Sequence, residues 1–379
     1  MTQPSMTQPP AMQPLAARPS VMQPSATQLP AMQPSVTQFP VARPFEAGAE
    51  TGGTGCALVI GESLIDIAGS VKHPGGSPMN VAVGLARLGR PVRLATWFGR
   101  DEAGALLADH LTASHVIVVP GSDGAARTSS ARVDFDETRA ASYVFDLEWR
   151  LPAAAVGDDV PVVVHTGSIA AALQPGAGDV LAVLRRLRDK TVISFDPNIR
   201  ASVIGPVGSV RPLVEQFVGL ADIVKASAED LAWLYPGLAP IDAARSWARG
   251  AGWARGAGWA GDAGWAGGAG WAKSKPGLVV LTKGAAGVTA ITRRSESDWP
   301  APEVAVADTV GAGDAFMAGL LHALWGAGLL GPVGASALPD IDAATLSQAL
   351  ATATKAAAVT LSRPGADPPW AVDIEETGR

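Results

Sequence analysis

The stretch of sequence that decides the fold is Asp308-Thr309-Val310-Gly311-Ala312-Gly313-Asp314-Ala315-Phe316. It is a glycine-rich turn that runs directly into an apolar stretch, Ala315 to Leu324, which indicates a helix. Small residues let successive backbone N–H groups converge, and a helix N-terminus adds a partial positive charge. The turn is therefore predicted to bind an anion, such as a transferring phosphoryl group, through the amides of Gly311, Ala312 and Gly313.

Asp314 closes this turn and brings a carboxylate to the edge of the predicted anion site. Such a carboxylate can take the proton from an attacking hydroxyl while the amides stabilise charge on the phosphoryl oxygens. An aspartate in this position is also typical of an N-cap after an ordinary glycine turn. The turn alone leaves both interpretations open.

A second glycine turn lies far upstream, in Gly75-Gly76-Ser77-Pro78-Met79-Asn80-Val81-Ala82-Val83-Gly84-Leu85-Ala86-Arg87-Leu88-Gly89. Gly75 and Gly76 allow a ligand to approach the backbone, and Asn80 offers both a donor and an acceptor early in a helix. These groups suit the recognition of a polyol. The segment is not a dinucleotide fingerprint, because no clear strand precedes it and no acidic residue follows at the required distance.

The rest of the chain alternates short β-rich runs with helical stretches. The predicted buried strands are Ala57–Ile60, Val162–His165, Thr191–Phe195, Ile223–Val224 and Leu278–Thr282. The predicted helices are Met79–Leu88, Gly178–Leu187, Ala228–Leu234, Ala315–Leu324 and Ala343–Leu361. Such alternation indicates a parallel sheet flanked by helices, with ligand sites at the carboxyl ends of the strands.

Together the two glycine motifs closely resemble the two signatures of the ribokinase, or phosphofructokinase-B, family of carbohydrate kinases. The resemblance covers roughly residues 55 to 372. It implies a ribokinase-like three-layer α/β sandwich with a mainly parallel central sheet, and a small β lid formed by about residues 66–75 and 116–148. The reaction that it implies is transfer of the ATP γ-phosphoryl group to a primary hydroxyl of a sugar, with Asp314 as the base.

The resemblance also assigns roles to single residues. For the sugar they are Asp66, in the segment Gly61 to Asp66, and Gly75, Gly76 and Asn80. For ATP they are Asn198, Lys225, Thr282, Gly284, Gly287, Gly311 and Gly313. Glu229 matches an acidic residue that holds Mg²⁺ through water, and Asp308 lies where a K⁺ site is implied. Competing interpretations are a surface strand for Asp66, a turn cap for Asn198 and a helix N-terminal charge for Glu229.

The acceptor sugar is less strongly indicated than the reaction. Fructose comes first, because Gly61–Asp66, Gly75–Asn80 and Asp196–Arg200 resemble the fructokinase branch. 2-Keto-3-deoxygluconate comes second; it needs a cation for its carboxylate, whereas the lid stretch Tyr143–Glu148 supplies acids. Ribose and nucleosides follow. A different hypothesis is a non-catalytic interaction protein on the same fold. The resemblance further implies a homodimer formed through the lid.

Composition argues against several other classes of protein. The chain of 379 residues is 47% hydrophobic and has a formal net charge of -6 with both signs interspersed, so nucleic-acid and membrane binding are not expected. Cys56 is the only cysteine, which excludes an intramolecular disulfide and fits a reducing cytoplasm. The histidines are scattered, which argues against a zinc site. The apolar stretch Ala315–Pro339 is interpreted as a buried helix and its exit loop.

Two low-complexity segments complete the organisation. Residues 1–52 repeat Pro-rich and Gln-rich units and are interpreted as a disordered extension, and residues 53–375 as the sugar kinase domain. Residues 247–273 contain tryptophans spaced by six and are interpreted as an expanded surface loop. A docking tail and a partner-binding tryptophan row are the alternatives.

Overall fold

A large sheet forms the centre of the fold. The computed structural model describes residues 55–135, 141–157, 159–249 and 276–375. In them nine strands pair in the order β13-β12-β11-β10-β9-β8-β1-β4-β5, and only β12, between β11 and β13, runs antiparallel to its neighbours. The strands are β1 (Ala57–Ile60), β4 (Val92–Ala95), β5 (Ile117–Val118), β8 (Val163–Gly167), β9 (Val192–Asp196), β10 (Ile223–Ser227), β11 (Leu278–Thr282), β12 (Val288–Thr292) and β13 (Glu296–Trp299).

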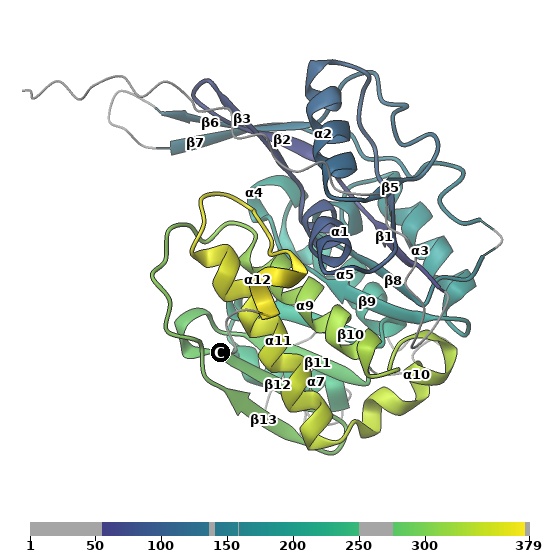
Figure 1. Cartoon of the computed structure of the whole chain (residues 1–379), viewed down its shortest axis with the longest axis vertical. Helices are drawn as coiled ribbons and strands as arrows, with labels where there is room; N and C mark the ends of the chain where they lie inside the picture. Colours follow the sequence, from purple (N-terminus) through teal and green to yellow (C-terminus); the bar gives the residue numbers. More distant parts are fainter. Residues whose placement is uncertain (1–54, 136–140, 158, 250–275, 376–379) are drawn as a thin grey trace, which may run out of the picture. The chain divides into compact units, whose positions relative to one another are not determined.

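Helices cover both faces of this sheet (Figure 1). One face carries α1 (Ser77–Arg87), α2 (Glu102–Ala113), α9 (Ala312–Gly326) and α11 (Ala343–Leu361). The other carries α3 (Gly176–Leu187), α5 (Val207–Leu220), α6 (Ala228–Leu234) and α7 (Pro240–Arg249). Alternate side chains of a strand point to opposite faces, so Val59 packs in the first core and Ile60 in the second. The result is the expected three-layer α/β sandwich.

Short helices fill the connections. They are η1 (Ser168–Ala171), α4 (Ala201–Ile204), η2 (Gly284–Ala286), α10 (Gly331–Ala337), η3 (Leu338–Asp340) and α12 (Ala371–Glu375).

A second, small sheet has the strand order β3-β2-β6-β7 and extends away from the large one (Figure 1). Its strands are β2 (Leu64–Ala68), β3 (Val71–Gly75), β6 (Ser130–Phe135) and β7 (Ala141–Asp146). The expected lid boundary at residue 116 needs correction, because β5 pairs with β4 in the large sheet. Of the segment 116–148, the strands of the small sheet therefore include only residues 130–135 and 141–146.

All five predicted strands and all five predicted helices are present; β1, β11, α6 and α11 have the predicted bounds, and the other six elements have shifted ends. The strand β10, which is predicted to stop at Val224, continues to Ser227 and so includes Lys225. A lysine after a run of buried apolar residues indicates the end of a strand, unless the acidic residue that pairs with it in the core is known. The strand β3 lies within the lid segment 66–75 that the family resemblance implies, although its own composition, with Lys72, His73 and Pro74 and large exposure, gives no signal for a strand.

Trp247 differs from the sequence interpretation. It was assigned to the surface loop, but it lies in α7, is only 1% exposed and donates a hydrogen bond from Nε1 to the Tyr235 hydroxyl at 2.9 Å. Trp247 is thus part of the core, although it shares the spacing of the repeat. The other four tryptophans of the repeat, and the extension 1–52, lie outside the described residues.

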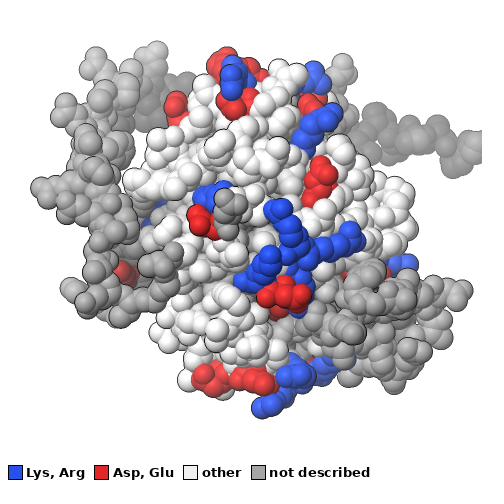
Figure 2. All heavy atoms as spheres, turned by 90° about the vertical axis from the view of Figure 1, so that its right-hand side faces the viewer, with Lys and Arg blue, Asp and Glu red and all other residues white. Residues whose placement is uncertain are grey.

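The described surface and its helices bear on the other sequence expectations. On the face in Figure 2, basic side chains lie beside acidic ones and most of the surface is uncharged. Within the described ranges, no single helix is long and apolar enough to cross a membrane. Only the pair Ala312–Gly326 and Gly331–Asp340, bent by 100°, has the required combined length and composition.

Candidate active site

A cavity of about 1190 Å³ lies where the two sheets meet. The small sheet contributes Asp66, Ala131 and Phe145 to its wall. The large sheet contributes Lys225 and Thr282 from the carboxyl ends of β10 and β11, which is where open α/β sheets bind ligands. Most of the predicted site residues line this one cavity: Asp66, Gly76, Asn80, Asn198, Lys225, Glu229, Thr282, Gly284, Gly287, Gly311, Ala312, Gly313 and Asp314.

The N-terminus of α9 opens into the cavity. Gly311 is its N-cap with φ 76°, and a Cβ there would lie 2.7 Å from the Ala366 Cβ, so only glycine fits. The amides of Gly311 and Gly313 have no hydrogen-bond partner within the described residues. The Ala312 amide differs from the prediction, because it donates a long bond of 3.4 Å to the Thr309 carbonyl. The amides that the predicted anion site offers are therefore mainly those of Gly311 and Gly313.

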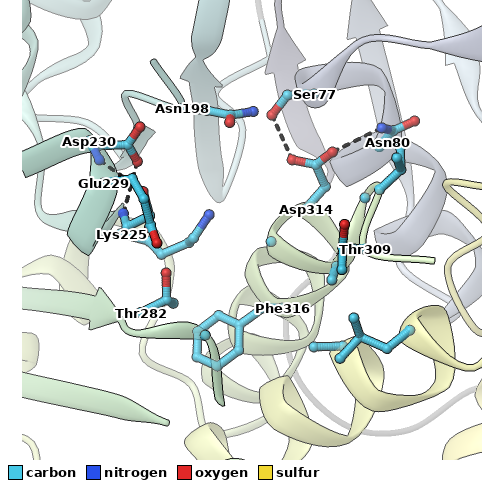
Figure 3. Close-up of a pocket in the computed structure, with 18 of the residues that line it drawn as sticks. Ser77, Asn80, Asn198, Lys225, Glu229, Asp230, Thr282, Thr309, Asp314 and Phe316 are labelled. Atoms are coloured by element: carbon cyan, nitrogen blue, oxygen red, sulfur yellow. Dashed lines mark hydrogen bonds between the residues drawn. The ribbon is translucent and has the colours of Figure 1, made fainter. Parts of the chain in front are cut away.

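Asp314 lies in the first turn of α9 and is held by two side chains of α1 (Figure 3). The Ser77 hydroxyl donates to Oδ1 at 2.7 Å, and the Asn80 amide donates from Nδ2 to Oδ2 at 2.9 Å. All three residues are buried and line the cavity. Asp314 is thus anchored by its carboxylate, and its carboxylate does not cap its own helix, because no side chain caps α9.

The two glycines before α1 act differently. Gly76, with φ 114°, lines the cavity, and a Cβ on it would lie 2.4 Å from the Glu62 carbonyl oxygen. Gly75 does not line it, and a Cβ there would collide with the Asp66 Oδ2 at 2.3 Å. Gly75 therefore leaves space for the Asp66 side chain. This role does not require the predicted contact between Gly75 and a sugar.

Asp66 lies on β2 at the small-sheet end of the cavity and remains exposed. Desolvation by the surrounding protein raises its pKa, and the charges of Arg200 and His73 partly offset this effect. An acceptor of hydrogen bonds at this place suits sugar hydroxyls.

Lys225 forms a buried ion pair with Asp196 at the floor of the cavity. Burial alone would lower the pKa of Lys225, but the Asp196 carboxylate outweighs it and the pKa is raised. Burial raises the pKa of Asp196 to about 6, with Lys225 opposing that shift, so the pair is ionised at neutral pH. A Cβ on Gly313 would lie 2.9 Å from the Lys225 Nζ, so the ammonium lies beside the anion site.

The segment after β9 links this floor to α6. Asn198 has φ 33°, and its N–H donates to the Asp196 Oδ1 at 3.2 Å. Asp230 accepts the Ile199 amide at 2.7 Å and the Ser227 amide at 2.8 Å, so its carboxylate is structural. Glu229, next to it, is exposed in the cavity and has no hydrogen bond or ion pair within the described residues. Glu229 is the carboxylate left for a ligand.

Three other predicted residues, Thr282, Gly284 and Gly287, line the part of the cavity beside β11 and η2. Thr282 ends β11, Gly284 is the first residue of η2, and Gly287 directly follows η2. Asp308 does not line the cavity: its carboxylate accepts the amides of Val310 at 3.1 Å and Gly365 at 2.9 Å, and these bonds lower its pKa. Across the described residues, no group of three or more His, Cys, Asp and Glu side chains is arranged around a metal ion.

Several cavity residues were not predicted from the sequence. The polar ones at the end near Asp66 include Glu62, Ser77, Ser168 and Arg200. Glu62 is buried, and its carboxylate accepts the Ala170 amide at 3.0 Å and is hydrogen-bonded by the Ser168 side chain. A glutamate two residues after the buried strand β1 was a signal for such a role, because an acid in an apolar run needs partners.

The stability of the protein should depend on pH through Glu62. Burial raises the pKa of Glu62 to about 7 from an ordinary 4.5, and the hydrogen bonds from Ser168 and Ala170 only partly oppose this. The folded state then binds more protons than the unfolded state between these values, so stability falls as pH rises from 4.5 to 7. Glu62→Gln cannot titrate. The free energy of unfolding of wild type relative to Glu62→Gln should fall by about 3 kcal/mol between pH 4 and 8.

Urea unfolding at four pH values measures this difference. Glu303→Gln is the control, because Glu303 lines the same cavity but is exposed. A difference between wild type and Glu62→Gln that does not change with pH would contradict the prediction.

The sequence is similar to those of known carbohydrate kinases. The sequence matches the pfkB family carbohydrate kinase over residues 58–250 and 267–372. It is 32% identical over 315 residues to a fructokinase from Klebsiella pneumoniae, covering 80% of this chain and 95% of the relative. It is 28% identical over 288 residues to an aminoimidazole riboside kinase from Salmonella typhimurium, covering 70% of this chain and 80% of the relative.

The fold agrees with a solved structure as well. A fructokinase double mutant from Vibrio cholerae, bound to fructose, ADP and a potassium ion, superimposes with a TM-score of 0.63 and 26% identity. It covers 84% of this chain, and this chain covers 95% of it. The chain therefore belongs to the pfkB family of carbohydrate kinases.

Proposed function

We propose that this carbohydrate kinase transfers the γ-phosphoryl group of ATP to a primary hydroxyl of a small sugar, most readily fructose, with Asp314 as the base. The observation that carries the proposal is the position of the Asp314 carboxylate. It lies in the first turn of α9, next to the amides of Gly311 and Gly313, which have no partner in the part of the chain that the structure describes, and faces the cavity that Asp66 and Asn80 also line. A base beside an anion site and a polar pocket is what this transfer requires.

The steps follow from these positions. The sugar hydroxyl gives its proton to a carboxylate oxygen of Asp314, and its oxygen attacks the γ-phosphorus. The bond between that phosphorus and the β,γ-bridging oxygen breaks, and ADP leaves. The amides of Gly311 and Gly313 and the Lys225 ammonium stabilise the negative charge on the phosphoryl oxygens during transfer.

A divalent cation fits the cavity through Glu229. Mg²⁺ prefers oxygen ligands and usually retains several waters, and the Glu229 carboxylate is exposed there without a protein partner within the described part of the chain. When bound, Mg²⁺ would neutralise charge on the nucleotide phosphates. The K⁺ site implied near Asp308 is supported by the related fructokinase structure with potassium, and Asp308 already orders the turn before α9.

Fructose is favoured as the acceptor because the alignment with the fructokinase from Klebsiella pneumoniae extends over 95% of that enzyme, at 32% identity. A sugar acid, such as 2-keto-3-deoxygluconate, is the second candidate, and Arg200 is the observation in its favour. Arg200 lines the cavity and its charge acts on both Glu62 and Asp66. It is a cation at the sugar end that could bind a carboxylate.

A coupled assay for ADP formation over a sugar panel tests the proposal. The panel contains fructose, 2-keto-3-deoxygluconate, ribose and nucleosides, each compared with a sugar-free control. Turnover with fructose is the expected result. Turnover with the sugar acid alone would replace fructose as substrate, and equal rates with and without every sugar would favour a non-catalytic interaction protein.

Asp66→Ala should weaken sugar binding specifically. The substitution deletes a hydrogen bond from a sugar hydroxyl to a charged acceptor, worth about 1.5 to 3 kcal/mol, so KM for the sugar should rise at least about tenfold. KM for ATP should stay near normal, because Asp66 lies on β2 in the small sheet. Initial rates with both substrates varied measure this. Asp109→Ala, an exposed change on α2, is the control; a sugar KM like that of the control would contradict the role.

We also infer a homodimer through the small sheet. Val71 on β3 is 51% exposed and Val144 on β7 is 54% exposed, so each edge strand of the small sheet offers one large apolar side chain to a second copy of the chain. Sedimentation velocity measures the state in solution.

A further inference from the structure

Ser77 is the first residue of α1 and one of the two side chains that bond the Asp314 carboxylate. Its hydroxyl is 2.7 Å from Oδ1, and the Asn80 amide is 2.9 Å from Oδ2, so each carboxylate oxygen has one donor. Residues three apart lie on the same side of a helix, which is why one turn of α1 can hold both oxygens. Figure 3 shows both bonds converging on Asp314.

The turn that carries Ser77 has little freedom to move. Gly76, which precedes it, packs against the Glu62 backbone. The backbone N–H of Asn80 donates to the Gly76 carbonyl at 2.9 Å. The ten residues from Ser77 to Ala86 are all buried. The Ser77 hydroxyl is therefore a fixed reference point for the carboxylate, because displacing it would disturb the packing of α1.

The two donors differ in their freedom to rotate, but each leaves a lone pair free on the carboxylate oxygen that it bonds. The Asn80 amide can only donate through its nitrogen, whereas the Ser77 hydroxyl can rotate about its C–O bond. Both leave a second lone pair on their carboxylate oxygen, and Asp314 faces the cavity, so a substrate hydroxyl can still approach. The charged groups near Asp314 are Lys225 on β10 and Asp196 on β9, and neither bonds its oxygens.

We propose that Ser77 is a positioning residue for Asp314, which fixes the carboxylate in the orientation that accepts the proton of the substrate hydroxyl. The inference rests on the proposed function, because it assigns Asp314 as the base. It goes beyond that function by giving the serine of the upstream glycine motif a role in the chemical step, and not in sugar binding alone.

A kinetic double-mutant cycle tests the inference. Ser77→Ala should lower kcat about tenfold with the sugar KM changed less than about twofold, since an aligned base matters mainly in the transition state. In an Asp314→Asn background, the same Ser77→Ala change should alter kcat less than about twofold, because no base remains to align. Ser77→Thr, which keeps the hydroxyl, should restore most of kcat.

A control variant separates positioning from folding. Ser246 on α7 is buried to a similar extent, at 7% exposed against 8% for Ser77, and its hydroxyl donates to the Ala243 carbonyl outside the cavity. Ser246→Ala should leave kcat near normal. If Ser77→Ala lowered kcat equally in both backgrounds, Ser77 would act on something other than Asp314. If it raised only the sugar KM, Ser77 would be a sugar contact.

The outcomes also distinguish this inference from the proposed function. A wild-type protein that turns over no sugar on the panel would remove the function and the Ser77 role together. An active wild type with additive Ser77 and Asp314 effects would overturn the Ser77 role alone.

Discussion

Asp314→Ala should lower kcat by roughly 10²- to 10⁴-fold, with little change in KM for either substrate. The substitution removes the base but leaves the unpartnered amides of Gly311 and Gly313, which remain able to bind the phosphoryl group. The sugar keeps Asp66 at the other end of the cavity. The loss should therefore fall on the chemical step, and rapid-quench single-turnover measurements of product formation check it.

Loss of the base must be separated from loss of stability. Asp314→Asn keeps the size of the side chain and should show nearly the same fall in kcat. Asp222→Asn is the matched control, because Asp222 and Asp314 are both 6% exposed and Asp222 accepts bonds from Arg188 and the Ile193 amide, outside the cavity. It should lower the urea midpoint with kcat near normal. A near-normal kcat in Asp314→Asn would remove the assignment of the base.

The parts of the fold that the sequence predicted well are those with local signals. The buried strands β1 and β11 are largely apolar runs, and α9 follows a turn whose Gly311 is required by the backbone. These features depend on neighbouring residues only, so a single sequence contains the information. The strand β3 lacked such a signal, because its ladder with β2 and not its composition defines it.

Within the site, the sequence predicted most of the residues that line the cavity but not which of their side chains bond each other. Asp314 and Ser77 are 237 positions apart, and nothing in either motif states that the hydroxyl of one bonds the carboxylate of the other. Asn80 was predicted as a sugar ligand, yet its amide nitrogen bonds Asp314. The packing of α1 on α9 creates both contacts, and such packing is a property of the tertiary fold.

Lys225 is a further case, and its position leads to the second large expected effect. Its ammonium is paired with Asp196 and lies beside Gly313, so it brings a positive charge next to the predicted anion site. The pair is almost fully enclosed, with Lys225 4% and Asp196 1% exposed. Removing only the lysine leaves a buried carboxylate without its partner, which typically costs about 3 to 5 kcal/mol of stability.

Lys225→Met should therefore lower both stability and turnover, with kcat reduced roughly 10²- to 10³-fold and KM for ATP raised. The double variant Lys225→Met/Asp196→Asn separates the two effects, because it also removes the unpaired buried charge. We expect its urea midpoint to recover most of the loss while kcat stays low, since no cation remains beside Gly313. Unfolding curves and initial rates on the wild type, the single variant and the double variant measure this. If turnover recovered together with stability in the double variant, the ion pair would only support the fold, and the amides of α9 would be sufficient for the transferring phosphoryl group.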